Sequence, residues 1–107
     1  MTNFKDRERG EEAKYAMDEE TAFKVAARRN RLFGEWAAEL MDLTPEETDA
    51  YKKAVVQADF EEAGDEDVIR KVLGDLTQAG CDVDEAAVRA KLEEKAIEAK
   101  RQFMSES

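Results

Sequence analysis

Apolar residues recur at intervals of three and four along most of the chain, a spacing that predicts α-helices. No stretch of useful length alternates apolar and polar residues, as a half-buried strand would. Short polar breaks divide the pattern into four segments, so we expect an all-α protein, a four-helix bundle. The expected helices lie at about residues 19–42, 45–62, 66–79 and 85–104.

Capping residues mark where three of these helices begin. Thr44 can cap the second helix, with Pro45 suited to its first position and Glu47 able to complete a capping box. Asp65 and Asp84 precede the third and fourth helices and are favourable N-caps. These starts are the sharpest boundaries that the sequence predicts.

Each expected helix carries an apolar stripe that should face its neighbours. In the first helix the large side chains lie mainly in the second half, so that half should pack into the bundle while the first half runs partly beyond it. Asn30 falls on the seam of this helix, where a buried amide can fix helix register. The stripe residues are Phe23, Ala26, Ala27, Phe33, Trp36, Ala37, Leu40, Met41, Tyr51, Ala54, Val55, Ala58, Ile69, Val72, Leu73, Leu76, Val88, Leu92, Ala96, Ala99 and Phe103.

Residues 1–18 differ from the rest of the chain. Their large apolar side chains are only Met1, Phe4, Tyr15 and Met17. Ordering the backbone costs about 1–2 kcal/mol per residue, which so little apolar surface cannot offset. We therefore expect a flexible N-terminal arm at residues 1–18, ahead of a bundle at residues 19–107. Opposite charges at helical spacing would let the arm become helical on a partner.

Charge and composition describe one acidic domain. The 107 residues include 27 Asp and Glu against 17 Lys and Arg, a net charge of -10, and 42% are apolar, enough for a packed core. An acidic chain lacks the attraction to phosphates that drives nucleic-acid binding, so we expect no nucleic-acid partner. We also expect no membrane insertion, because no apolar run is long enough. The single Cys81 and the lack of a signal-peptide pattern favour a cytoplasmic protein.

Most catalytic and metal-binding chemistry is excluded by residue type. The chain has no histidine and one cysteine, so a Cys–His nucleophile pair or a structural zinc site cannot form. The acidic run at residues 59–67 lacks the ligand spacing of a calcium loop and reads as a solvated turn. Paired carboxylates need a cleft to become catalytic, and so small a bundle has little room for one. We therefore expect a binding or regulatory module with no enzymatic activity, no metal and no cofactor.

A basic cluster interrupts the first helix. Arg28, Arg29 and Arg31 form either a solvated face that pairs with Glu35 and nearby acids, or a cationic patch. Such a patch would suit an acidic partner surface or a nucleotide phosphate, although no glycine-rich phosphate loop accompanies it. The spacing leaves both interpretations open.

Several stretches distributed along nearly the whole chain carry a family resemblance. They are residues 4–8 (FKDRE), 12–15 (EAKY), 27–30 (ARRN), 34–38 (GEWAA) and 58–68 (ADFEEAGDEDV). Together these stretches resemble the zeta subunit family, the ATPase-inhibitor subunits of F-type ATP synthases in alpha-proteobacteria.

The resemblance implies a four-helix bundle with a mobile N-terminal inhibitory segment. That segment is expected to fold into the interface between alpha and beta subunits of the soluble head and to block rotation in the direction of ATP hydrolysis. The implied partners are alpha and beta, with gamma a further candidate, at the inner face of the bacterial inner membrane. On this basis we predict the contact residues Phe4, Lys5, Arg7, Glu8, Arg9, Glu12, Lys14 and Tyr15, with Arg28, Arg29 and Arg31 as candidates for a secondary contact or for a nucleotide phosphate.

Two other functions fit the residues. One is a helical bundle that senses adenine nucleotide, weakly bound through the basic cluster. The other is a generic acidic interaction module for an unrelated basic protein.

Overall fold

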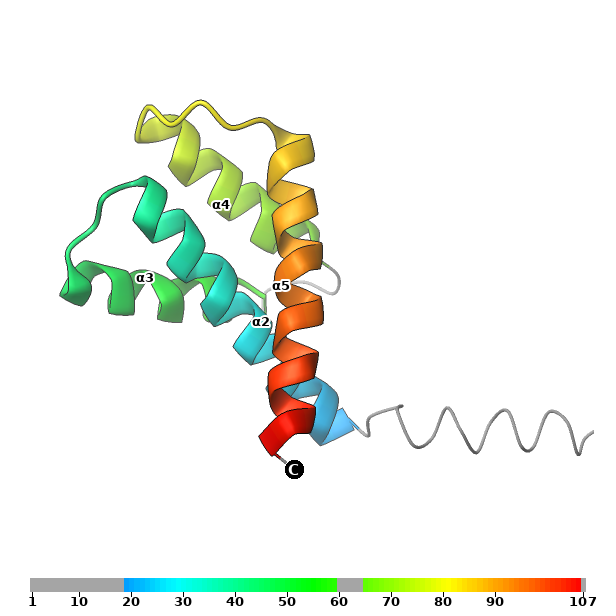
Figure 1. Ribbon diagram of the computed structural model, residues 1–107. Helices are drawn as coiled ribbons and strands as arrows, with labels where there is room; N and C mark the ends of the chain where they lie inside the picture. Colours follow the sequence, from blue (N-terminus) through cyan, green and yellow to red (C-terminus); the bar gives the residue numbers. More distant parts are fainter. Residues whose placement is uncertain (1–18, 60–64, 107) are drawn as a thin grey trace, which may run out of the picture.

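The computed structural model describes residues 19–59 and 65–106, which form four helices and no strand (Figure 1). The expectation of an all-α fold is confirmed, whereas the arm expected at residues 1–18 lies outside the described residues. None of the described helices is both long and apolar enough to cross a membrane. The helices are α2 (Glu19–Leu40), α3 (Pro45–Ala58), α4 (Glu66–Gln78) and α5 (Glu85–Glu106).

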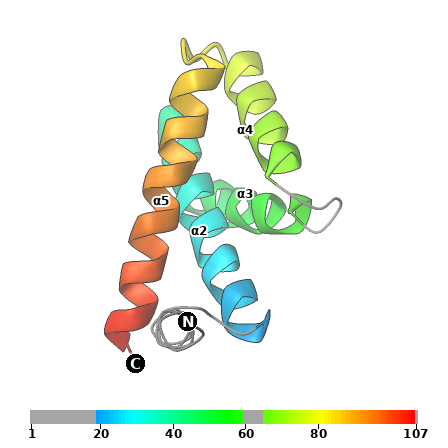
Figure 2. The ribbon, with the colours of Figure 1, turned by 90° about the vertical axis from the view of Figure 1, so that its right-hand side faces the viewer.

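The two longest helices, α2 and α5, lie side by side and form the axis of the bundle (Figures 1 and 2). α3 packs on the second half of α2, and α4 packs beside the first half of α5. The first turns of α2 and the last turns of α5 therefore extend beyond the other two helices. The first half of α2 is nevertheless partly covered, because Val25 is buried. The first half of α2 therefore extends past α3 and α4, as predicted, but it is not wholly outside the bundle.

Two of the predicted caps form as expected. The Thr44 hydroxyl accepts a bond from the Glu47 N–H (3.1 Å), and the Glu47 carboxylate accepts one from the Thr44 N–H (2.9 Å), which completes the capping box. The Asp84 carboxylate accepts a bond from a backbone N–H in the first turn of α5 at 2.9 Å. Asp65 occupies the N-cap position of α4 but makes no capping bond, because its carboxylate instead accepts a bond from Arg29.

The helix ends differ slightly from the predicted ones. α2 and α4 end at Leu40 and Gln78, one or two residues earlier than expected. α3 ends at Ala58 and not at residue 62, and residues 60–62 lie outside the described part of the chain. α5 continues two residues further, to Glu106, whose side chain is held by an arginine of α2.

The core is built mainly from the predicted stripes. Val25, Ala38 and Val68 are buried although they were not assigned to a stripe, and Phe23 is exposed although it was. Leu40 was expected in the core but is 43% exposed, because it stands at the last position of α2. Trp36 is partly buried and its ring stacks on Phe33. The core residues are Phe33, Ala37, Val55, Val68, Ile69, Val72, Leu76, Val88 and Leu92.

Candidate functional site

The predicted site residues fall into two groups, of which the structure describes one. The basic cluster on α2 is described in full. The predicted arm contacts Phe4, Lys5, Arg7, Glu8, Arg9, Glu12, Lys14 and Tyr15 lie outside the described residues. The candidate site that the structure describes therefore consists of Arg28, Arg29 and Arg31 and the residues around them.

Arg28 links the first half of α2 to the last turn of α5. Its two terminal nitrogens donate bonds of 2.8 and 2.9 Å to the two carboxylate oxygens of Glu106, in the last turn of α5. Bidentate pairs of this kind fix geometry as well as charge. The hydrogen bonds raise the pKa of Arg28 and lower the pKa of Glu106. Residue 19, where the chain enters α2, therefore lies at the same end of the molecule as the last turn of α5 (Figure 2).

Arg29 joins α2 to both ends of the acidic connection between α3 and α4. Its side chain is only 13% exposed and donates a bond to Asp65 at 3.0 Å, with a second carboxylate, that of Asp59, 3.5 Å away. A largely buried cation is stable only when carboxylates such as these neutralise it, so the Arg29 guanidinium has a structural role in the fold.

Asn30 completes the same network from inside the core. It is 1% exposed, accepts a bond from Arg29 and donates one to Asp59, each at 3.0 Å. The expected burial of this amide is confirmed, and its hydrogen bonds explain how an amide is tolerated there. Neither aspartate was predicted to contact the first helix: Asp59 was assigned to a solvated turn and Asp65 to the N-cap of the next helix.

Arg31 completes the cluster on the surface. It is exposed and forms no ion pair with any of the residues that the structure describes. Glu35, its expected partner one turn later, lies instead 4.0 Å from Lys52 of α3. The three arginines thus do not form one cationic patch, and a phosphate would have to displace carboxylates from Arg28 and Arg29.

A hollow of about 490 Å³ between α2, α4 and α5 has arginines on its rim, but these are neutralised. Arg89 donates bonds of 2.8 and 2.9 Å to both carboxylate oxygens of Glu66, and one of 2.7 Å to Glu85. These bonds raise the pKa of Arg89 and lower that of Glu66. Since Arg29 is also paired, the hollow offers no uncompensated positive charge to an anion.

A second polar cluster that the sequence did not predict joins α3 to α4. The Tyr51 hydroxyl donates a bond to Asp75 at 2.8 Å, and the Lys71 ammonium donates one to the same oxygen at 3.1 Å. Lys71 also lies over the Tyr51 ring, 5.2 Å from its centre. Burial, followed by the bond to Asp75, raises the pKa of Tyr51. Tyr51 had been assigned only to an apolar stripe.

Comparison with known proteins covers nearly the whole chain. A family model described as ATPase inhibitor subunit zeta matches residues 1–102. One matching solved structure, determined by solution NMR, is 53% identical with a TM-score of 0.70, over 79% of this chain and 96% of that one. No curated protein matches the chain.

Proposed function

The chain belongs to the ATPase inhibitor subunit zeta family, and from this membership we propose that it inhibits ATP hydrolysis by an F-type ATP synthase. The observation that carries the proposal is the extent of the match, because residues 1–102 include both the proposed inhibitory arm and the bundle. The protein would act by binding and not as an enzyme. Its expected location is the cytoplasm, at the inner face of the bacterial inner membrane when bound to the synthase.

Residues 1–18 are the proposed inhibitory element. They would fold into the interface between alpha and beta subunits of the soluble head and act as a wedge against rotation in the direction of hydrolysis. Gamma is a further candidate partner. The support is compositional: a segment so poor in apolar surface gains order mainly from a partner. The proposed contacts are Phe4, Lys5, Arg7, Glu8, Arg9, Glu12, Lys14 and Tyr15.

The bundle would serve as a stop outside the interface. The Arg28–Glu106 pair holds the start of α2 to α5, and the Arg29 network ties α2 to the connection between α3 and α4. A force on residues 1–18 would therefore be transmitted to all four helices. Of the three arginines in the basic cluster, Arg31 is best placed to meet an acidic partner surface, because it is exposed and has no ion pair in the described structure.

The decisive experiment measures ATP hydrolysis by the isolated catalytic head. The full chain is expected to inhibit it, and a chain lacking residues 1–18 is expected not to, provided that its circular dichroism shows an intact bundle. Equal inhibition by both chains would exclude the wedge mechanism.

Substitutions refine this test without shortening the chain. Phe4→Ala combined with Tyr15→Ala should weaken inhibition at least tenfold, because buried aromatic anchors typically dominate binding energy. Thr77→Ala, at an exposed position of α4, is the matched control and should inhibit as the native chain does. Full inhibition by the double variant would remove these residues from the proposed contacts.

Nucleotide sensing through the basic cluster has less support, because Arg28 and Arg29 are bound to carboxylates. It is tested by titrating ATP or ADP into the free protein and following the amide resonances of residues 28–31. Unchanged spectra would dismiss it, whereas saturable shifts centred on these residues would support it.

A further inference from the structure

The side of α5 that faces away from the core carries a regular pattern. Val88, Leu92 and Ala99 of α5 are buried in the bundle. On the opposite side lies a row of seven residues, all exposed, which we name the outer stripe. The outer stripe consists of Ala90, Glu93, Glu94, Ile97, Lys100, Arg101 and Met104.

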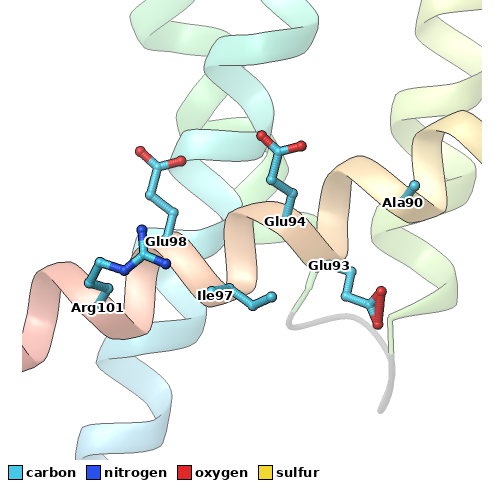
Figure 3. A pocket seen from close by; sticks show the side chains of 6 residues that line it. All are labelled: Ala90, Glu93, Glu94, Ile97, Glu98 and Arg101. Atoms are coloured by element: carbon cyan, nitrogen blue, oxygen red, sulfur yellow. The ribbon is translucent and has the colours of Figure 1, made fainter.

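Apolar residues of the outer stripe recur every seven positions. Ala90, Ile97 and Met104 follow one line along the helix, as in the contact seam of a coiled coil. Ile97 is 57% exposed and Met104 is 45% exposed, which makes them two of the four large apolar side chains that the described residues leave in solvent. Shallow hollows lie beside them, and Figure 3 shows Ile97 between Glu93 and Arg101 along the helix.

The charges of the outer stripe are largely unused within the chain. Glu93, Lys100 and Arg101 form no ion pair in the described structure, whereas Glu94 accepts a bond from Lys91 of the same helix at 3.0 Å. Acidic residues occupy the third and fourth positions before Ile97, and basic residues the third and fourth positions after it. The stripe is therefore complementary to a reversed copy of itself.

We propose that two copies of the chain associate antiparallel through their outer stripes, with Ile97 on the two-fold axis. The axis brings Glu93 against Lys100 of the second copy and Glu94 against Arg101 of the second copy, and each pair occurs twice. It also sets the small Ala90 opposite the long Met104 of the second copy. A parallel arrangement would oppose like charges, so charge fixes the orientation.

The contact is small and the dimer is correspondingly weak. Residues 90–104 span about 21 Å of helix, and three apolar residues per copy bury less than the roughly 1,200 Å² typical of stable interfaces. Association thus depends on concentration. Because each α2 begins beside the end of its own α5, the two N-terminal segments start at opposite ends of the dimer. The proposal does not depend on the inhibitory function.

Sedimentation of the full chain from about 10 μM to about 1 mM tests the proposal, since weak contacts populate dimers in this range. The native chain should sediment increasingly as a dimer. Lys100→Glu places Glu against Glu twice and should weaken association roughly tenfold. Glu93→Lys combined with Lys100→Glu restores both pairs and the net charge, and should restore association. Arg31→Glu, an equal charge change away from the stripe, should have no effect.

Cross-linking tests the register. In a chain carrying Cys81→Ala, Ile97→Cys should give a disulfide-linked dimer with oxidised glutathione, because residue 97 meets its own counterpart. Thr77→Cys, exposed on α4, should not. A native chain that remains monomeric throughout the range, or a dimer that Lys100→Glu leaves unchanged while the variant keeps its helical spectrum, would overturn the proposal.

Discussion

Asp42 ends α2 in the left-handed conformation, with φ of 59°, which glycine adopts at no steric cost and aspartate does not. The Leu43 N–H donates to the Ala38 carbonyl and the Asp42 N–H to the Glu39 carbonyl, each at 3.1 Å, as in a Schellman motif. Gly80 ends α4 in the same way, with φ of 84°.

The two positions should respond oppositely to substitution. Asp42→Gly is expected to raise the free energy of unfolding by about 0.5–1 kcal/mol, because it relieves steric cost and removes a negative charge from a helix C-terminus. Gly80→Ala is expected to lower it by about 1 kcal/mol. Urea denaturation measures both. A loss of stability in Asp42→Gly would mean that the aspartate side chain contributes more than the backbone strain costs.

Tyr51 makes the bundle sensitive to alkali. Its folded-state pKa is raised, chiefly by burial, so its contribution to stability is complete below about pH 10 and is lost as the pH rises towards the folded value. Tyr51→Phe cannot ionise there. It should be less stable by about 1 kcal/mol at neutral pH, through loss of the bond to Asp75. Its stability should also fall less steeply above pH 10, as denaturation at a series of pH values would show; parallel curves would contradict this.

Residue-scale features were predictable where they depend on near neighbours in the chain. The Thr44 capping box involves residues three apart, and the seam position of Asn30 follows from helical spacing. The partners of Arg28 and Arg29 lie 78 and 36 residues away, so they depend on how the helices pack. That is why the sequence did not predict that Asp59 and Asp65, at the two ends of the acidic turn, pair with Arg29.

At the scale of elements, one glycine governs the contact between α2 and α3. A Cβ on Gly34 would lie 3.2 Å from the Lys52 Cα and 3.3 Å from Val55 Cγ2, closer than ordinary packing allows. Gly34 is buried, so the added group could not turn into solvent. Gly74 on α4 is exposed, and a Cβ there would meet nothing within 4 Å.

Substitution of these two glycines should have opposite effects on stability. Gly34→Val should lower the free energy of unfolding by about 1–3 kcal/mol, because overpacking pushes α3 away from α2. Gly74→Ala should raise it by roughly 0.5–1 kcal/mol, because alanine favours helix. Thermal and urea denaturation give the signs. A stable Gly34→Val variant would show that the two helices can separate at little cost.

The positions of the helices along the chain were more predictable than which helices pack against each other. The apolar stripes predicted four helices, but periodicity does not say which stripe faces which. It therefore could not show that Val25, a residue outside the predicted stripe, is buried. Nor could it exclude Leu40 from the core, because that depends on where α2 ends.

Acid should destabilise the whole molecule through its ion pairs. Hydrogen bonds from Arg89, Lys91 and Arg28 lower the pKa values of Glu66, Glu94 and Glu106 below 4.5. Groups lowered in this way stabilise the fold above their unfolded pKa, and that stabilisation is lost as the pH falls through the folded values. Stability should therefore decline below about pH 4.5.

The decline is measured by urea denaturation between about pH 6 and pH 2.5, a range that spans these titrations. In a variant that combines Glu66→Gln with Glu106→Gln, the free energy of unfolding should fall less steeply as the pH is lowered, because neither amide titrates. This low-pH part of the curve is the acid limb. Glu46→Gln is the control, since Glu46 is exposed and has no ion pair in the described structure, and should leave the limb unchanged. An unchanged limb in the double variant would show that other carboxylates dominate.

At the scale of function, local motifs identified the family and the whole-chain match confirms it. The arm contacts remain predictions, because they depend on a partner surface that this sequence does not encode. For the basic cluster, the sequence could not distinguish between a face that pairs with acidic residues and a cationic patch. Adjacent arginines on a helix point in different directions, and the structure shows that two of them, Arg28 and Arg29, form ion pairs with carboxylates elsewhere in the chain.

The Arg28–Glu106 pair has a practical consequence for labelling the protein. A fluorescent protein fused after residue 107 would stand beside the point where residues 1–18 enter α2, and its bulk would hinder access to that segment. A dye on Asp82→Cys in a Cys81→Ala chain would sit in the α4–α5 connection, at the far end of the molecule (Figure 1). That site would let single-molecule measurements follow the protein with little interference at its N-terminal end.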